Sequence, residues 1–316
     1  MTFAPERKRL MVANWKMNKT LAETRHYFRE LLAALRAVSQ TASQPMATTH
    51  DAAPVLSGAV EVVICPPFTA LAAYREMFPE DVPYLFALGA QNMHMRPSGA
   101  FTGEISAAML LEHGVTYVII GHSERRQYAA ESDEAVAEKS LQALKNGLVP
   151  IVCIGETAEE RAAGETEDVL LRQLRPVLQA LALALNEKAA SGETSDRFLS
   201  ATPASNEAKQ GRWLDPDQLE LVIAYEPVWA IGTGQAATPD DAAQAATFVR
   251  KAVEKALGAR TASRLRILYG GSVTPDNISG YLEALNIDGA LVGGASLDIA
   301  SWLTIIERAR RVGDAR

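Results

Sequence analysis

The chain has 316 residues, of which 48% are hydrophobic and 22% are charged, and its formal charge is −7 at pH 7. This composition is typical of a globular protein with a sizeable core and excludes a disordered chain. The negative charge argues against a nucleic-acid-binding surface, although it allows one small phosphate site.

The N-terminal segment, residues 1–10, carries charges where a signal peptide would need an apolar core. No run of about 18 apolar residues follows it. The two cysteines cannot form a disulfide framework, and the sequence has no C-x-x-C or H-E-x-x-H spacing. We therefore expect a cytoplasmic protein that enters no membrane and holds no metal or cofactor.

Short β-rich apolar runs alternate along the chain with stretches whose apolar residues recur at helical spacing. The predicted strands are 10–14, 60–65, 83–91, 115–121, 148–155, 221–226, 265–270 and 288–294. Helical patterns include 21–38 and 131–147, and two more near 240–257 and 275–285 open with Pro-Asp pairs. Strict alternation implies parallel strands buried on both faces. The pattern predicts a (β/α)8 barrel, with an open doubly wound sheet as the alternative.

Two polar stretches, residues 39–59 and 186–217, interrupt this alternation. Each is punctuated by small and polar residues, follows a predicted helix and precedes a strand. We interpret them as insertions before the second and sixth strands of a single barrel domain spanning residues 1–316. Because loops that precede the strands lie opposite the active site of such barrels, we expect neither insertion to take part in chemistry.

Polar side chains follow several of the predicted strands where each strand ends. The first strand leads into Asn14 and Lys16, the fourth into His122, and the sixth ends at Glu226. Taken alone, Lys16 resembles a solvated loop lysine and His122 a structural histidine, whereas burial of an unpaired Glu226 would be costly. Since these strand ends meet at one mouth of a closed barrel, their convergence predicts a catalytic site.

Glycines follow the last two strands, as Gly270-Gly271-Ser272 and Gly293-Gly294. Without side chains, their backbone N–H groups can approach an anion closely, and a phosphate site after strands seven and eight recurs in barrels. Simple turn glycines are the alternative.

Residues 232–237 fit the pattern G-x-G-x-x-A of dinucleotide-binding folds. The fit is poor, because five residues separate the pattern from the strand and the next strand ends in Gly270-Gly271 rather than in an acid. A glycine-containing flap that closes over a ligand is the better interpretation.

Five motifs follow one another along the chain, at residues 14–18, 121–126, 224–234, 269–273 and 291–296. In this order they resemble the triosephosphate isomerase family. The resemblance covers nearly the whole chain outside the two insertions and the first residues. It implies a TIM barrel enzyme of glycolysis and gluconeogenesis. The implied reaction interconverts dihydroxyacetone phosphate and D-glyceraldehyde 3-phosphate by proton transfer through an enediolate.

The resemblance also implies roles for the residues at the strand ends. Glu226 would be the base, and His122, kept neutral by a helix N-terminus near Ser123, would polarise the substrate oxygens. Lys16 and Asn14 would stabilise the enediolate oxygen and the bound anion. Glu124 would support the position of Lys16.

The implied phosphate site and lid involve residues farther along the chain. Residues 227–234 would form the lid, and Ile231 and Leu291 would keep water from the carboxylate. The implied phosphate-binding residues are Gly232, Ser272, Gly293 and Gly294. The resemblance further implies a homodimer, in which Thr102 reaches Asn14 of the neighbouring subunit.

Two other functions are compatible with these residues. A phosphosugar aldolase would use Lys16 as a Schiff-base nucleophile. Alternatively, the barrel would bind a phosphosugar without turning it over.

Overall fold

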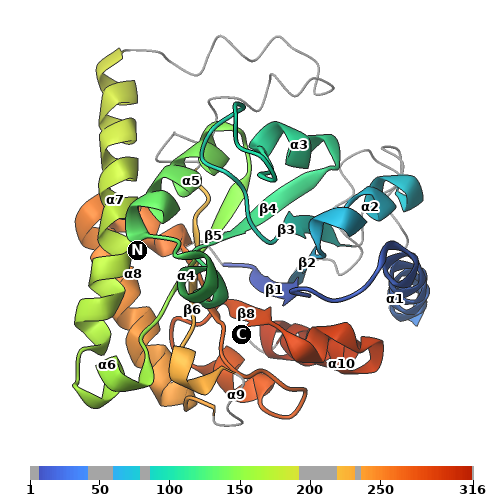
Figure 1. The fold of residues 1–316 in the computed structure, drawn as a ribbon. Coiled ribbons are helices and arrows are strands. Elements are labelled where there is room, and N and C mark those ends of the chain that lie inside the picture. Colours follow the sequence, from blue (N-terminus) through green and yellow to red (C-terminus); the bar gives the residue numbers. More distant parts are fainter. Residues whose placement is uncertain (1–6, 42–59, 79–85, 192–218, 232–235, 315–316) are drawn as a thin grey trace.

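The computed structural model describes residues 7–41, 60–78, 86–191, 219–231 and 236–314. Within these ranges, parallel strands close into a barrel in chain order, with β8 paired to β1 (Figure 1). The strands are β1 (Arg9–Asn14), β2 (Val60–Cys65), β3 (Ala87–Ala90), β4 (Val115–Ile120), β5 (Val149–Ile154), β6 (Val222–Tyr225), β7 (Arg266–Tyr269) and β8 (Gly289–Val292). The predicted (β/α)8 barrel is confirmed, and the open sheet is wrong.

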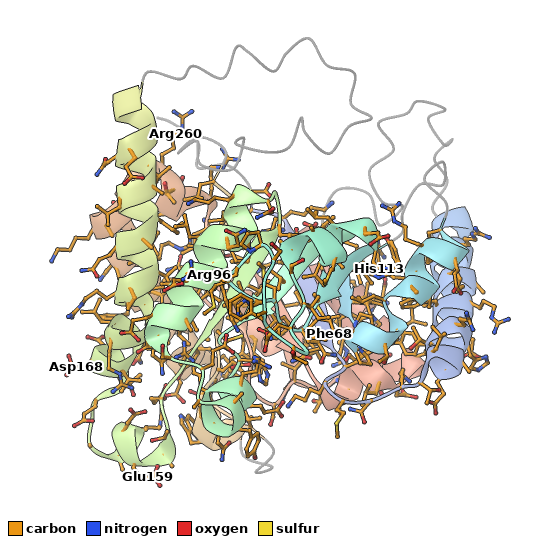
Figure 2. All side chains as sticks on the ribbon, turned by 45° about the horizontal axis from the view of Figure 1, so that its top comes forward. Phe68, Arg96, His113, Glu159, Asp168 and Arg260 are labelled. Carbon is orange, nitrogen blue, oxygen red and sulfur yellow. The ribbon has the colours of Figure 1, made fainter. Side chains whose placement is uncertain are left out.

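Helices surround this barrel. They are α1 (Leu21–Thr41), α2 (Ala72–Met77), α3 (Ala107–Glu112), α4 (Ser123–Ala129), α5 (Asp133–Lys145), α6 (Ala158–Ala162), α7 (Thr166–Ser191), α8 (Pro239–Arg264), α9 (Ile278–Glu283) and α10 (Ile299–Asp314). Short 3-10 helices are η1 (Phe68–Ala70), η5 (Val228–Ala230) and η6 (Gly294–Leu297). Figure 2 shows α7 and α8 along one side of the barrel, from the end near Asp168 to the end near Arg260.

Alternate residues of each strand enter different parts of the core, because successive side chains of a strand point to opposite faces. Leu10 and Val12 of β1 pack with residues of other strands inside the barrel. Met11 and Ala13 belong to the larger cluster between the barrel and the helices. Burial on both faces explains why the strands are continuous apolar runs.

Several predicted boundaries differ from the structure, and three of the differences have an identifiable cause or consequence. The Asn277 side chain accepts the N–H of Thr274 and closes a turn, so α9 begins only at Ile278 and the Pro-Asp pair precedes it. Residues 39–41 and 186–191 continue α1 and α7, so the predicted insertions start too early. The remainder of both stretches, apart from this helical part, lies outside the described residues.

The carboxyl ends of the strands all point to one mouth of the barrel, where the polar residues singled out above follow them. In the part of the chain that the structure describes, no helix is long and apolar enough to cross a membrane.

Candidate active site

Glu226 directly follows β6 and is buried, with 2% of its surface exposed. Its Oε1 lies 3.0 Å from Nε2 of His122, which follows β4. Its Oε2 accepts a hydrogen bond from the backbone N–H of Ser123 at 2.9 Å. The structure thus brings together the carboxylate and the imidazole, which follow two different strands and lie 104 residues apart on the chain.

Glycines after the neighbouring strands leave room for Glu226. A Cβ on Gly155, after β5, would lie 1.7 Å from the backbone oxygen of Glu226. A Cβ on Gly270, after β7, would lie 2.8 Å from Cγ of Glu226. Both contacts are too close for any side chain. Gly270, expected from the sequence to expose an amide to an anion, therefore makes space for the carboxylate.

Burial and hydrogen bonding oppose each other at Glu226. Burial raises the pKa of this carboxyl, because it disfavours the charged form. The ring of His122, the N–H of Ser123 and the charge of Lys16 outweigh burial and leave the pKa below its ordinary value. The site therefore keeps Glu226 ionised in spite of its burial.

His122 is the residue before the first turn of α4. Its Nδ1 accepts a hydrogen bond from the backbone N–H of Glu124 at 3.2 Å. A nitrogen that accepts carries no proton, so the proton of the neutral ring lies on Nε2 and is donated to Glu226. Burial lowers the pKa of His122, but the nearby Glu226 carboxylate raises it above the ordinary value. Protonation of Nδ1 would break the bond to the helix end.

The turn after β1 holds Lys16 in the left-handed region, with a φ of 51°, a conformation that costs roughly 1 kcal/mol or more for a residue with a side chain. The backbone N–H of Lys16 donates to Oδ1 of Asn14 at 3.0 Å, and Gln91 Nε2 donates to its carbonyl at 2.8 Å. The Lys16 ammonium lies 2.7 Å from Oε1 of Glu124. Asn14, Gln91 and Glu124 therefore fix both ends of Lys16.

The loops after β7 and β8 border this site. A Cβ on Gly293 would lie 3.5 Å from Cε of Lys16, and a Cβ on Gly294 would meet no atom within 4 Å. The open space beside Gly294 agrees with close approach of a ligand to its amide, whereas a side chain on Gly293 would contact Lys16. The Ser272 hydroxyl donates to the carbonyl of Ala230 at 2.7 Å. The fourth predicted phosphate residue, Gly232, lies outside the described residues.

Glu156 connects the barrel to the segment after β6. It is fully buried, and its Oε1 accepts hydrogen bonds from Trp229 Nε1 at 2.8 Å and from the Tyr225 hydroxyl at 3.0 Å. The Arg161 guanidinium stacks 4.2 Å from the Trp229 ring centroid. Glu156 is not among the residues predicted from the sequence, although it follows β5 as His122 follows β4, and this placement could have identified it.

The two apolar residues predicted to shield the carboxylate lie in different surroundings. Leu291 of β8 is buried inside the barrel. Ile231 is half-buried and directly follows η5. The remainder of the predicted lid, residues 232–234, lies outside the described residues. Within the described part of the chain, no group of three His, Cys, Asp or Glu side chains is placed to hold a metal ion.

Comparison with known proteins relates residues 9–309 to a family described as Triosephosphate isomerase. A relative of that name from Symbiobacterium thermophilum is 44% identical over 297 residues, which cover 94% of each chain. Relatives of the same name from Carboxydothermus hydrogenoformans and Chloroflexus aurantiacus are 43% and 42% identical. These matches cover 95% and 94% of this chain, and 98% and 97% of the two relatives.

Proposed function

Because the chain belongs to the triosephosphate isomerase family, we propose that Glu226 is the base that moves a proton between C1 and C2 of a triose phosphate. The chain is an isomerase that interconverts dihydroxyacetone phosphate and D-glyceraldehyde 3-phosphate, a step of glycolysis. The observation that carries the proposed role is the 3.0 Å contact between Glu226 and His122. Neither the aldolase nor the non-catalytic barrel is favoured by the relatives.

The proton next to a carbonyl is too weakly acidic for a carboxylate in water, so the site has to stabilise the enediolate oxygen. Both oxygens of Glu226 are engaged, by His122 and by Ser123. The carboxylate therefore has to leave Nε2 of His122 in order to reach the substrate proton. The released Nε2–H is then free to donate to a substrate oxygen, together with Lys16 and Asn14.

Lys16 acts in this scheme as a cation and not as a nucleophile. Its ammonium is paired with Glu124 at 2.7 Å, and an amine must lose its proton before it can attack a carbonyl. Glu124 is accordingly a positioning residue, which holds the Lys16 charge near the developing oxyanion.

The phosphate would be bound by the backbone amides of Gly232, Gly293 and Gly294 and by the side chain of Ser272. Ser272 has to release the carbonyl of Ala230 to do so, which would couple phosphate binding to movement of η5. Closure of residues 227–234 would bring Ile231 over Glu226 and toward Leu291 of β8. Exclusion of water disfavours the charged carboxylate and makes it a stronger base.

A coupled assay on glyceraldehyde 3-phosphate tests the role of Glu226. In Glu226→Asp the carboxylate is withdrawn by about 1 Å, and we expect kcat to fall by about 100-fold or more. Glu112→Asp, which shortens a carboxylate on α3 outside the site, is the control and should leave kcat unchanged. Full activity of Glu226→Asp would refute the proposed base.

We also propose that the chain acts as a homodimer through the loop that contains Thr102. Residues 96–104 are exposed in the single chain, and Phe101 is 43% exposed within them. Met17, next to Lys16, is 95% exposed, as expected for a side chain that a second subunit covers. Thr102→Arg combined with Glu104→Arg should give a chain that sediments as a monomer and has low isomerase activity. Fully active monomers would refute the dimer proposal.

The remaining expectations concern the whole chain. We propose one barrel domain over residues 1–316, in the cytoplasm, with no nucleic-acid partner. The predicted insertions come after α1 and α7 in the sequence, and loops that precede the strands of such a barrel lie opposite the active site. Deletion of residues 42–56 should therefore change kcat by less than about tenfold, since no residue that touches substrate is removed.

A further inference from the structure

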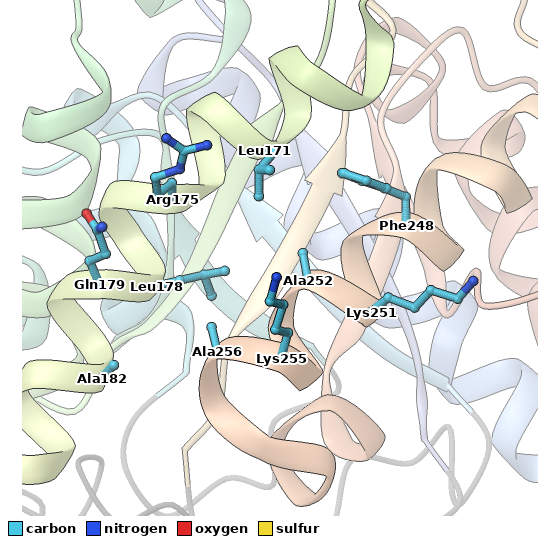
Figure 3. Close-up of a pocket in the computed structure, with 10 residues that line it drawn as sticks. All are labelled: Leu171, Arg175, Leu178, Gln179, Ala182, Phe248, Lys251, Ala252, Lys255 and Ala256. Atoms are coloured by element: carbon cyan, nitrogen blue, oxygen red, sulfur yellow. The ribbon is translucent and has the colours of Figure 1, made fainter.

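A pocket of about 690 Å³ lies between α7 and α8, on the outer layer of the barrel (Figure 3). This volume is typical of small-molecule sites. Its lining residues are Leu171, Arg175, Leu178, Gln179, Ala182, Phe248, Lys251, Ala252, Lys255 and Ala256. None of them belongs to the candidate active site.

The floor of the α7/α8 pocket is apolar because the two helices turn apolar faces toward each other. Leu171 and Leu178 are seven residues apart on α7, and Phe248 and Ala252 are four apart on α8, so each pair shares one helix face. In Figure 3, Leu178 and Phe248 point into the space between the helices. Alanine side chains on both helices, such as Ala252, are too short to fill this space.

The charged residues of the pocket all have the same sign. Arg175, Lys251 and Lys255 line it, and no acidic residue does. None of the three forms a salt bridge with another residue in the described ranges. Figure 3 shows Lys255 extending into the gap between the helices and Lys251 extending away from it. On a chain of net charge −7, an unpaired cluster of cations beside an apolar floor favours an amphipathic anion.

We propose that the α7/α8 pocket binds a free fatty-acid anion, with its alkyl chain along the apolar floor and its carboxylate at Arg175 and Lys255. A guanidinium matches a planar carboxylate with two parallel hydrogen bonds. Inorganic phosphate would leave the apolar floor unused, and an uncharged chain would leave the cations unused. A protein partner would bury a surface far larger than this pocket.

Calorimetric titration of the full-length chain with octanoate, decanoate and dodecanoate, each below its micelle concentration, tests the proposal. Each buried methylene should tighten binding by about two- to fourfold. Decanol should bind more weakly than decanoate, and inorganic phosphate should give no heat assignable to this pocket. Absence of saturable binding, or an affinity independent of chain length, would overturn the proposal.

Three variants locate the binding. Ala252→Trp fills the pocket and should weaken dodecanoate binding by roughly tenfold or more. Lys255→Gln should weaken it by about fivefold, the effect of one exposed ion pair. Lys145→Gln, on α5, removes the same charge outside the pocket and should leave the affinity unchanged.

Isomerase turnover of each variant verifies its fold, since no lining residue touches the active site. If Ala252→Trp does not fold, Lys255→Gln still tests the proposal, because it alters an exposed side chain and should not disturb the fold. Equal affinity of Lys255→Gln and Lys145→Gln would place the fatty acid elsewhere and overturn the proposal. The proposal would also be overturned if a second copy of the chain occupied the pocket, which would show as an oligomeric state in sedimentation that changes in Lys255→Gln.

Discussion

The Nε2 atom of His122 lies 3.0 Å from Oε1 of Glu226, and the backbone N–H of Ser123, the next residue, lies 2.9 Å from Oε2. The N-terminal end of α4 thus contacts both oxygens of the carboxylate that follows β6. These contacts describe a resting site, in which the base is ionised but turned away from a substrate proton. The same contacts determine how activity should depend on pH.

The Ser123 amide should keep Glu226 ionised at low pH. Ser123 is the first residue of α4, where proline is well tolerated, and the ψ of 141° at His122 lies in the range that a residue before proline adopts. Ser123→Pro therefore removes the N–H donor together with the hydroxyl, without breaking the helix. A hydrogen bond to a charged group is worth about 1.5 kcal/mol, so the pKa of Glu226 should rise by about one unit.

The measurement is the acid limb of kcat/KM against pH in the free enzyme. In the wild type the folded pKa of Glu226 lies below its ordinary value of 4.5, so the part of the acid limb that reports Glu226 lies below that pH. Protonation of His122, whose pKa is raised above its ordinary value, gives a separate step at higher pH. The lowered pKa of Glu226 also stabilises the fold above pH 4.5, and this contribution is lost as pH falls through the folded pKa. Ser123→Ala keeps the N–H and is the control; an acid limb identical in both variants would contradict the assignment.

Variants of Lys16 and of Glu124 should differ in activity, because Lys16 carries the charge that acts on substrate and Glu124 only positions it. Lys16→Met removes an oxyanion-stabilising cation and should lower kcat/KM by about 100- to 1,000-fold. Glu124→Gln leaves that cation in place without its anchor, so we expect a smaller loss, mostly in kcat and roughly tenfold. A loss in Glu124→Gln as large as in Lys16→Met would show that Glu124 does more than position Lys16.

The sequence predicts residues whose role depends on where a strand ends, and misses those whose role depends on a tertiary contact. Asn14, Lys16, His122 and Glu226 could be found because barrel closure brings strand ends together whatever the side-chain packing. Gln91, in contrast, acts through the Lys16 carbonyl, a contact between segments 75 residues apart.

Gly270 shows the same limit in another form. Its place after β7 suggests an anion-binding amide, but what its missing side chain accommodates is Cγ of Glu226. The start of α9 was predicted too early for a local reason, because Asn277 closes a turn around the Pro-Asp pair before the helix begins. A side-chain hydrogen bond of this kind competes with helix formation, and helix propensity alone does not predict it.

The Glu156–Trp229 hydrogen bond should control the segment after β6. Trp229→Phe and Tyr225→Phe each remove one donor to the same buried Oε1, and each should cost about 1–3 kcal/mol of stability. Only Trp229 lies in η5, at the base of the proposed lid. We therefore expect kcat and KM to change together in Trp229→Phe and to remain near wild type in Tyr225→Phe. Equal kinetic effects would assign Glu156 a purely structural role.

The ion pair of Lys139 and Glu131 should be a sensitive point for stability. The Lys139 ammonium lies 2.7 Å from Oε1 of Glu131 and 2.9 Å from Oδ1 of Asn92, and all three residues are buried. Glu131 also binds Arg125 at 2.6 Å, but that guanidinium is a third exposed. Removal of Lys139 thus leaves Glu131 with one partner that water competes for.

Lys139→Met should lower the free energy of unfolding by about 3–5 kcal/mol, because an anion stays buried without its main partner. Arg172→Met, which breaks an exposed pair with Glu160, should cost less than about 1 kcal/mol. Denaturant unfolding at pH 7 and fixed protein concentration measures both variants. Since replacing both members of a buried pair relieves the unpaired charge, Lys139→Met combined with Glu131→Gln should be more stable than Lys139→Met alone. A double variant that is less stable than Lys139→Met would show that Glu131 stabilises the fold mainly through Arg125.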